Sequence, residues 1–236
     1  MKIVFPHIPK CAGSSVQKQL KARDDVYLDY FNNPLCVHEA DRAAGQAEQQ
    51  ALQGKVASTE SWIVFGHFAC SAYNELPYDR LIVLLRNPLE RAVSHFYFIK
   101  DTLIDDEVHR RGYPEVGLIK DGKMSLDEYL ELDHVRFFYS DYYLKDVILD
   151  DRITVFPVEQ LKTAYRNIAK LTDIRLDAGV WTNRGKYRSD CEQHRSNFAR
   201  DEELYRKLIE HTERQRRSDR TQGGIFHRMA ARLLKD

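Results

Sequence analysis

A run near the N-terminus, KIVFPHIPKCAGSSVQKQL, combines the residue types that bind anions. An apolar strand pattern leads into Lys10, small residues and two serines, and a helical pattern follows. Backbone N–H groups at such a turn point toward a bound anion, and Ala12 and Gly13 allow close approach. Ser14 and Ser15 add hydroxyl donors and are expected to cap the helix. The run therefore predicts an anion-binding loop made of Lys10, Cys11, Ala12, Gly13, Ser14 and Ser15.

This run differs from the phosphate loop of nucleotide kinases, because GxxxxGK[ST] is absent and Lys10 precedes Gly13. A plain strand-to-helix turn with a serine cap would also fit the pattern, and short motifs often match by chance. The run alone leaves both interpretations open.

A second group of anion-binding residue types lies in LLRNPLERAVSHFYF, where an apolar strand pattern ends at Arg86 and Pro88 begins a helical one. Ser94 follows two turns into that helix, so Arg86 and Ser94 can converge on one phosphate. A guanidinium binds phosphate through two parallel hydrogen bonds, and a serine hydroxyl adds a donor. The alternative is an ordinary helix start with a solvated charged face, on which Arg91 pairs with a carboxylate.

The third candidate is His67, in FGHFACSAY, directly after another apolar strand pattern. An imidazole at the end of that strand can act as a general base near neutral pH. A single histidine is more often structural, so a catalytic role for His67 is supported only in combination with the two anion sites.

The candidate residues all follow strands of one predicted parallel sheet. Apolar runs predict its strands at 2–5, 26–30, 62–65, 80–86 and 152–156. Helical patterns alternate with them at 14–22, about 38–53, 88–100, 158–171 and 201–217. This alternation predicts an α/β fold, a P-loop-like parallel sheet of about five strands flanked by helices. Ligands of such folds bind at the carboxyl ends of the strands, so Lys10, His67 and Arg86 would share one rim.

Two segments depart from the alternation. Residues 101–150 are rich in acidic and aromatic residues, and Ser125 and Glu128 predict a capping box within them. We expect this segment to be a mostly helical insert that shapes the cleft. The tail, 201–236, predicts a helix, a break at the two glycines of QGGIF, and a short amphipathic helix.

The bulk composition fits a globular protein with a single domain, residues 1–236. Hydrophobic residues make up 43% of the chain, charged residues 31%, and the formal net charge is zero. No global charge therefore favours nucleic acid or an anionic membrane as a partner. The four cysteines show neither pairing nor zinc-ligand spacing, which predicts reduced thiols in a cytoplasmic protein. The sequence shows no signal-peptide pattern, and no apolar run approaches the ~20 residues that cross a bilayer.

Together, the three motifs that contain Lys10, His67 and Arg86 resemble those of the PAPS-dependent sulfotransferases. The resemblance is closest to the carbohydrate branch, which includes the heparan and dermatan/chondroitin 2-O-sulfotransferases. HIPKCAGSSV is similar to the family's 5′-phosphosulfate loop, and LLRNPLERAVSHFYF is similar to its 3′-phosphate motif. GH, between them, matches the position of that branch's catalytic histidine. ITVFPVEQL and TNRG are similar to a later strand and to an asparagine-containing loop near the nucleotide. The resemblance covers 1–100 well, 101–150 thinly, and 152–210 weakly but in order.

The resemblance implies that the donor is 3′-phosphoadenosine 5′-phosphosulfate (PAPS), that the product is 3′-phosphoadenosine 5′-phosphate (PAP), and that no metal is required. Lys10 and the backbone N–H groups of Cys11 to Ser15 would hold the 5′-phosphosulfate. Lys10 would also stabilise the leaving phosphate as its bond to sulfur breaks. Arg86 and Ser94 would hold the 3′-phosphate. His67 would contact the acceptor and take the proton from its hydroxyl.

Further site residues are expected in two segments. The loop WTNRGKYR carries Asn183, Arg184 and Lys186, and it matches a family loop that closes over the nucleotide; a solvated basic loop is the alternative. In HVRFFYSDYY the aromatic rings could stack on a sugar, and Arg136 could bind a carboxylate or sulfate of a glycan. Aromatic residues at helical spacing are more often core, and we expect most of these rings to be core.

The chain also departs from the family. Many members carry Thr at the position of Cys11, so a hydroxyl donor is missing here. Neither a Golgi anchor nor a disulfide pair is evident, which favours a bacterial-type cytoplasmic enzyme and argues against a glycosaminoglycan substrate. The expected acceptor is a carbohydrate or glycolipid hydroxyl. No nucleic-acid partner is expected, and any membrane contact would be peripheral.

Two other functions stay open at this point. A P-loop-like kinase of small molecules is disfavoured by the missing GK[ST] and by the lack of an obvious Mg²⁺ carboxylate after a strand. A non-catalytic nucleotide-binding module would keep the fold. It predicts the loss of Lys10 or His67, and both residues are present.

Overall fold

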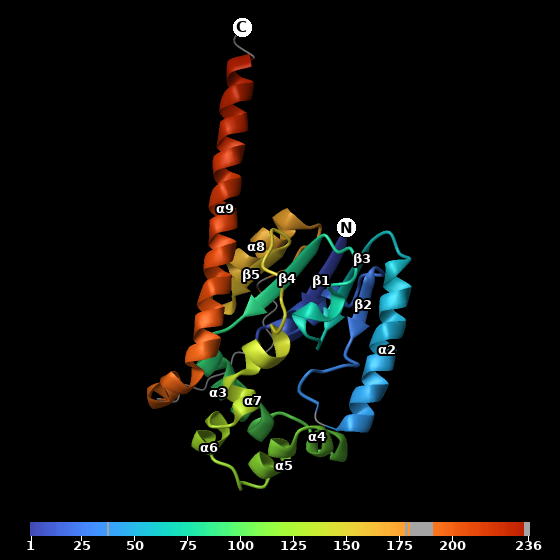
Figure 1. Ribbon diagram of the computed structural model, residues 1–236, viewed down its shortest axis with the longest axis vertical. Helices are drawn as coiled ribbons and strands as arrows, with labels where there is room; N and C mark the ends of the chain where they lie inside the picture. The colour runs from blue at the N-terminus through green and yellow to red at the C-terminus, as the bar shows by residue number, and fades with distance from the viewer. Residues whose placement is uncertain (37, 178, 180–190, 234–236) are drawn as a thin grey trace.

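Five parallel strands form one sheet in the order β2-β3-β1-β4-β5 (Figure 1). The computed structural model describes residues 1–36, 38–177, 179 and 191–233. The strands are β1 Lys2–Pro6, β2 Val26–Asp29, β3 Trp62–Gly66, β4 Arg80–Leu85 and β5 Ile153–Pro157. This sheet, flanked by helices, confirms the predicted α/β fold.

The three central strands are apolar after the first residues of β1 and β4, Lys2 and Arg80, as expected for strands that are covered on both faces. Every residue of β3 is buried, and so are the last four residues of β1 and the last five of β4. β1 lies between β3 and β4, with Val4 opposite Val64 on one side and Leu81 on the other. The carboxyl ends of these strands are therefore neighbours, as predicted.

Helices predicted from the sequence follow the strands along the chain. They are α1 Gly13–Leu20, α2 Glu39–Ala57, α3 Pro88–Asp101 and α8 Leu161–Leu171, with short 3-10 turns η1 Cys70–Tyr73 and η3 Val158–Gln160. α2 contacts β2 at one edge of the sheet, and α8 contacts β5 at the other. α3 begins as its sequence indicates, with the Asn87 side chain accepting from the N–H of Glu90 and Pro88 in the first turn.

The segment 101–150 is a helical insert, as expected. It contains α4 Glu107–Gly112, α5 Pro114–Lys120, α6 Leu126–Leu130, α7 Asp133–Arg136 and the π-helical turn η2 Phe138–Tyr143. The capping box of Ser125 and Glu128 is present. Figure 1 shows α4 to α7 gathered beyond the carboxyl ends of the strands. Phe138, Tyr139 and Tyr143 are buried in the core of the sheet, which confirms the core interpretation for these rings.

The tail differs from its prediction. A 3-10 segment, η4 Glu192–Phe198, precedes one long helix, α9 Ala199–Leu233, which continues through Gly223 and Gly224 without the expected break. A glycine inside a helix costs about 1 kcal/mol relative to alanine, which weakens a helix but does not by itself end one. The first half of α9 contacts β5, where the Thr212 hydroxyl accepts a hydrogen bond from the N–H of Val155.

Within the described part of the chain, no helix has the length and apolar character that crossing a lipid bilayer requires.

Gly66, the last residue of β3 and the residue before His67, packs closely against Asp29 at the end of β2. A Cβ atom at Gly66 would lie 1.7 Å from the carbonyl oxygen of Asp29, a distance that only backbone movement can relieve. Asp29 is itself fixed, because its carboxylate accepts hydrogen bonds from Gln49 and Tyr73. The small residue in the GH pair is thus a packing requirement of the sheet.

We expect Gly66→Ala to destabilise the fold by about 2 kcal/mol or more, because the added methyl group overpacks a rigid contact. Gly54→Ala is the matched control: Gly54 lies inside α2, and a methyl group added there would meet no atom within 4 Å, so alanine should stabilise by about 1 kcal/mol. Urea unfolding of both variants measures the difference. Equal stabilities would contradict this account of the β2–β3 contact.

Candidate active site

A cavity of about 630 Å³ lies at the carboxyl ends of β1, β3, β4 and β5. It brings together most of the predicted site residues, namely Lys10, Ala12, Gly13, Ser14, Ser15, His67, Arg86 and Ser94. Phe98, Tyr113 and Val116 line its other side, from α3 and the insert. The two predicted anion sites and the predicted base therefore face one space.

The loop between β1 and α1 takes an unusual backbone path. Lys10 and Ala12 both adopt left-handed conformations, with φ of 67° and 64°, a conformation that costs most non-glycine residues about 1–2 kcal/mol. Within the described residues, the N–H groups of Lys10, Ala12, Gly13 and Ser14 donate no hydrogen bond to the protein. Such strain and such free donors are features of anion-binding loops.

Two predictions about this loop need correction. The N–H of Cys11 donates to the carbonyl of Ile8, and that of Ser15 donates to Ala12, so neither is a free anion donor. The Cys11 side chain is buried and turned to Tyr139, although Ser15 still lines the cavity. The helix cap is Ala12, without a side-chain cap, because the two left-handed residues start α1 before the serines.

Lys10 carries a charge that no described carboxylate neutralises. Its Nζ lies 4.1 Å from the centre of the Phe98 ring, and no ion pair of the described residues includes it. Burial, and secondly the nearby Arg86, lower the pKa of Lys10 to about 8. Lys10 is thus still mostly protonated at pH 7, at a cost that a bound anion would remove.

Arg86 follows β4 directly and is held by its backbone. The Tyr139 hydroxyl donates to the Arg86 carbonyl at 2.7 Å and lies 3.3 Å from the Arg86 N–H, while Cys11 Sγ lies 3.5 Å from the same hydroxyl. One tyrosine therefore links both predicted anion sites. Among the described residues, the guanidinium itself contacts only the Glu90 carboxylate, through Nε at 3.3 Å, an exposed pair that contributes little.

The α3 helix presents Ser94 and His95 to the cavity. His95 Nδ1 hydrogen-bonds the Tyr129 hydroxyl at 2.8 Å, and burial, with the Arg91 charge as a second cause, lowers the His95 pKa well below its usual value. Arg91 does not lie on a solvated face. It is buried, with its guanidinium 3.5 Å from the centre of the Phe138 ring, and it donates to the Val135 carbonyl.

His67 stands in a stack of aromatic rings. Its ring centre lies 4.3 Å from that of His7 and 4.9 Å from that of Tyr30, and His7 Nδ1 hydrogen-bonds the Tyr30 hydroxyl. Burial lowers the pKa of His67 to about 4, although the backbone of His7 opposes the shift. His67 is therefore neutral at pH 7. Its buried Nδ1 has no hydrogen-bond partner among the described residues.

The remaining predicted residues lie elsewhere. Arg136 is not among the residues that line the cavity; it pairs with Glu131 and Asp133 near its own helix. Asn183, Arg184 and Lys186 lie outside the described residues.

Three histidines of the cavity wall were not predicted from the sequence: His7, His95 and His109. His7 precedes the Lys10 loop and His95 follows Ser94, so their positions within the two motifs could have identified both as site residues. Gly13 also matters for His7, because a Cβ atom there would lie 1.7 Å from the His7 ring. His109 gives no comparable signal, because the fold of the insert alone brings it to the cavity.

Comparisons with known proteins give matches only among solved structures. No family model matches the chain, and no curated protein matches it. The chain is similar to a sulfotransferase from Alicyclobacillus acidocaldarius, with 16% identity, a TM-score of 0.46, and coverage of 88% of this chain and 95% of that one. It is also similar to mouse sulfotransferase SULT7A1 complexed with PAP, with 12% identity, a TM-score of 0.35, and coverage of 85% and 65%.

We expect Lys10→Met to stabilise the ligand-free protein at pH 7 by about 1–3 kcal/mol, the cost of holding a partly buried ammonium whose pKa has fallen from 10.5 to about 8. The Lys10 side chain of the unfolded chain is protonated more than that of the folded one between these two pH values, so the contribution of Lys10 to wild-type stability becomes less unfavourable as pH rises across that range. The stability that Lys10→Met gains over wild type should therefore shrink above pH 8 and vanish near pH 10.5. Unfolding curves at several pH values test this.

The exposed Lys18 of α1 provides the control, because Lys18→Met should give no pH-dependent gain. A Lys10→Met variant that is no more stable than wild type at pH 7 would show that the Lys10 charge is already neutralised.

Proposed function

We propose that this protein is a PAPS-dependent sulfotransferase that transfers the sulfuryl group of PAPS to a hydroxyl of a carbohydrate or glycolipid. The observation that carries the proposal is the pairing of two cationic groups, Lys10 and Arg86, in one cavity with the free N–H donors of the β1–α1 loop. A ligand with two separated anionic ends would satisfy both groups at once.

The residues divide naturally between the two ends of such a donor. The N–H groups of Ala12, Gly13 and Ser14 and the Lys10 ammonium would hold the 5′-phosphosulfate at the start of α1. Arg86 and Ser94 would hold the 3′-phosphate, with Arg86 leaving its weak contact to Glu90. The 3′-phosphate distinguishes PAPS from ATP and AMP, so these two residues would set nucleotide specificity.

Lys10 would supply most of the electrostatic catalysis. PAPS provides an activated sulfuryl group, whose bond to the phosphate oxygen breaks as the acceptor oxygen bonds to sulfur. The Lys10 ammonium would stabilise the negative charge that the phosphate oxygen gains. Because Phe98 and burial exclude water around Nζ, this stabilisation would be stronger than in bulk solvent.

His67 would accept the proton that the acceptor hydroxyl loses. It is neutral at pH 7, as a base must be, and its position beside the Lys10 loop suits a group that contacts the acceptor. A pKa of about 4 makes a weak base in the ligand-free protein. The negative charge of a bound donor would raise that pKa, so donor binding would activate the base.

We expect PAP to raise the melting temperature by several degrees more than AMP or ATP does, because only PAP carries a 3′-phosphate for Arg86 and Ser94. Arg86→Met should remove most of this difference. Arg80→Met, at the opposite end of β4, is the control and should keep it. Equal shifts for PAP and AMP in wild type would disprove the role of Arg86, and a larger shift with ATP would favour a kinase.

We expect His67→Gln to leave the PAP-induced melting shift intact and to lower the rate of sulfuryl transfer by about 10²-fold or more, the usual effect of losing a general base. Transfer is measured with radiolabelled PAPS on carbohydrate and glycolipid acceptors. His109→Gln serves as the comparison, because His109 also lines the cavity and is the alternative base. Its Nδ1 lies 2.8 Å from the Asp106 carboxylate, which orients the ring. An active His67→Gln variant beside an inactive His109→Gln variant would move the base to His109.

A further inference from the structure

The helical insert is acidic, although it forms one wall of the cavity. Residues 101–150 contain thirteen Asp and Glu and six Lys and Arg, a formal net charge of −7 with histidines neutral. The rest of the chain carries the balancing positive charge, since the whole is neutral. An acceptor that approaches along the insert therefore meets a negative field, which repels polyanions.

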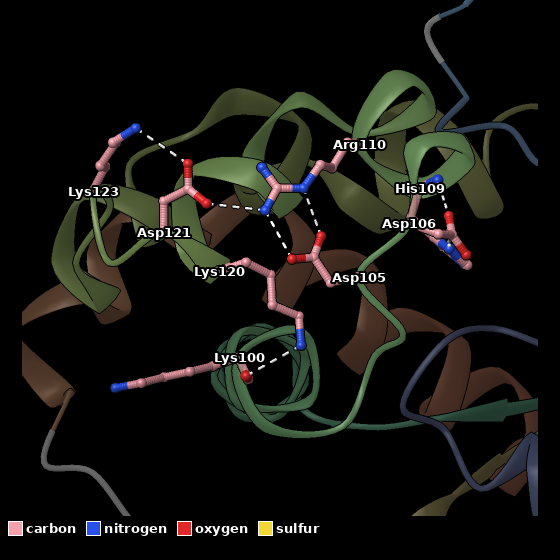
Figure 2. A network of polar contacts seen from close by, with 8 residues as sticks. All are labelled: Lys100, Asp105, Asp106, His109, Arg110, Lys120, Asp121 and Lys123. Atoms are coloured by element: carbon pink, nitrogen blue, oxygen red, sulfur yellow. Dashed lines mark hydrogen bonds and ion pairs between the residues drawn. The ribbon is translucent and has the colours of Figure 1, made fainter.

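All three arginines of the insert are already engaged. Arg110 donates to Asp105 at 2.6 and 2.8 Å and to Asp121 at 2.9 Å. Figure 2 shows these three residues and the contacts between them. The Asp121 carboxylate also accepts a hydrogen bond from the Lys123 ammonium in the same network. These contacts hold α4 against α5, so Arg110 serves the fold of the insert.

The other two arginines are paired in the same way. Arg111 contacts the Asp41 carboxylate at 3.0 Å, tying α4 to the start of α2. Arg136 contacts Glu131 and Asp133. These exposed pairs are weak one by one, so what opposes a sulfated or carboxylated glycan is chiefly the net negative charge of the insert. The insert is therefore poorly suited to a glycosaminoglycan.

A second cavity, of about 310 Å³, adjoins the first and has a mostly apolar wall. Its apolar lining residues include Pro34, Leu118, Met124 and Leu132, and its polar ones include Arg42 and His134. Leu35, Tyr113 and Glu115 belong to both cavities. The two cavities are therefore neighbours, and an acceptor long enough to pass this shared wall would reach both.

Glu115 is the polar group of the shared wall. It is only 7% exposed, and its Oε1 lies 3.2 Å from Nε2 of His134. A buried carboxylate held by one partner keeps further acceptor capacity, which suits a hydroxyl-bearing ligand and opposes an anionic one.

We propose that the acceptor is a neutral, glycolipid-like molecule, with its hydroxylated head in the first cavity and an alkyl or aryl portion in the second. This inference rests on the proposed sulfotransferase function and narrows its acceptor class. The apolar portion is excluded from water against Leu118, Met124 and Leu132, so acceptor affinity increases with its length. The acidic insert excludes polyanionic glycans.

The test compares two neutral acceptors and one polyanion. Octyl β-glucoside, below its micelle concentration, and methyl β-glucoside differ only in the apolar chain, and heparosan supplies the carboxylated polymer. Binding to the PAP-saturated protein is measured by calorimetry, and transfer is measured with radiolabelled PAPS. Leu118→Asp places a charge in the second cavity. Leu149→Asp is the matched control, because Leu149 is similarly exposed (46% against 40%) and lines neither cavity.

The expected result is binding of octyl β-glucoside about tenfold or more tighter than of methyl β-glucoside in wild type and in Leu149→Asp. In Leu118→Asp the preference should fall to about twofold or less, with the PAP melting shift unchanged. Equal binding of the two glucosides, an unchanged preference in Leu118→Asp, or preferred binding of heparosan would overturn the inference. Loss of the PAP melting shift in wild type would instead reject the proposed function.

Discussion

Two like charges held close together in a half-buried cavity are the constraint around which this site is built. Lys10 and Arg86 repel each other, and among the described residues only Arg86 has a carboxylate partner, an exposed and weak one. The fold keeps both charges near the carboxyl ends of parallel strands, where backbone N–H groups add to the positive potential. Such an arrangement sacrifices stability in the empty protein and recovers it when an anion binds.

Burial also keeps three of the four cavity histidines uncharged. His7, His67 and His95 all have pKa values lowered chiefly by desolvation, so each is uncharged at neutral pH and none adds to the repulsion between the cations. A neutral imidazole can accept a proton, whereas a protonated one cannot. Burial thus serves both purposes: it limits positive charge in the empty cavity and keeps the candidate base in its reactive form.

Local sequence predicted the parts of the site that lie next to strand ends. Lys10, His67 and Arg86 each follow an apolar run, and parallel pairing brings those ends together. Turn geometry and contacts distant in sequence were beyond such reasoning: the N–H of Cys11 donates to the Ile8 carbonyl in a local turn, and His109 reaches the cavity only through the insert. Two predictions were wrong. The serines do not cap α1, because residues in the left-handed conformation start that helix before them. The tail does not break at its two glycines, because α9 continues through them.

Tyr139 gives the site a dependence on a distant part of the chain. Its hydroxyl joins the Cys11 and Arg86 loops, and its own N–H donates to the buried Asp201 carboxylate at the start of α9. The groups proposed for chemistry all precede residue 100, yet the geometry between them is completed by a residue synthesised much later. A nascent chain would therefore carry every reactive side chain well before it could hold them in register, and assembly of the cavity would be among the last events of folding.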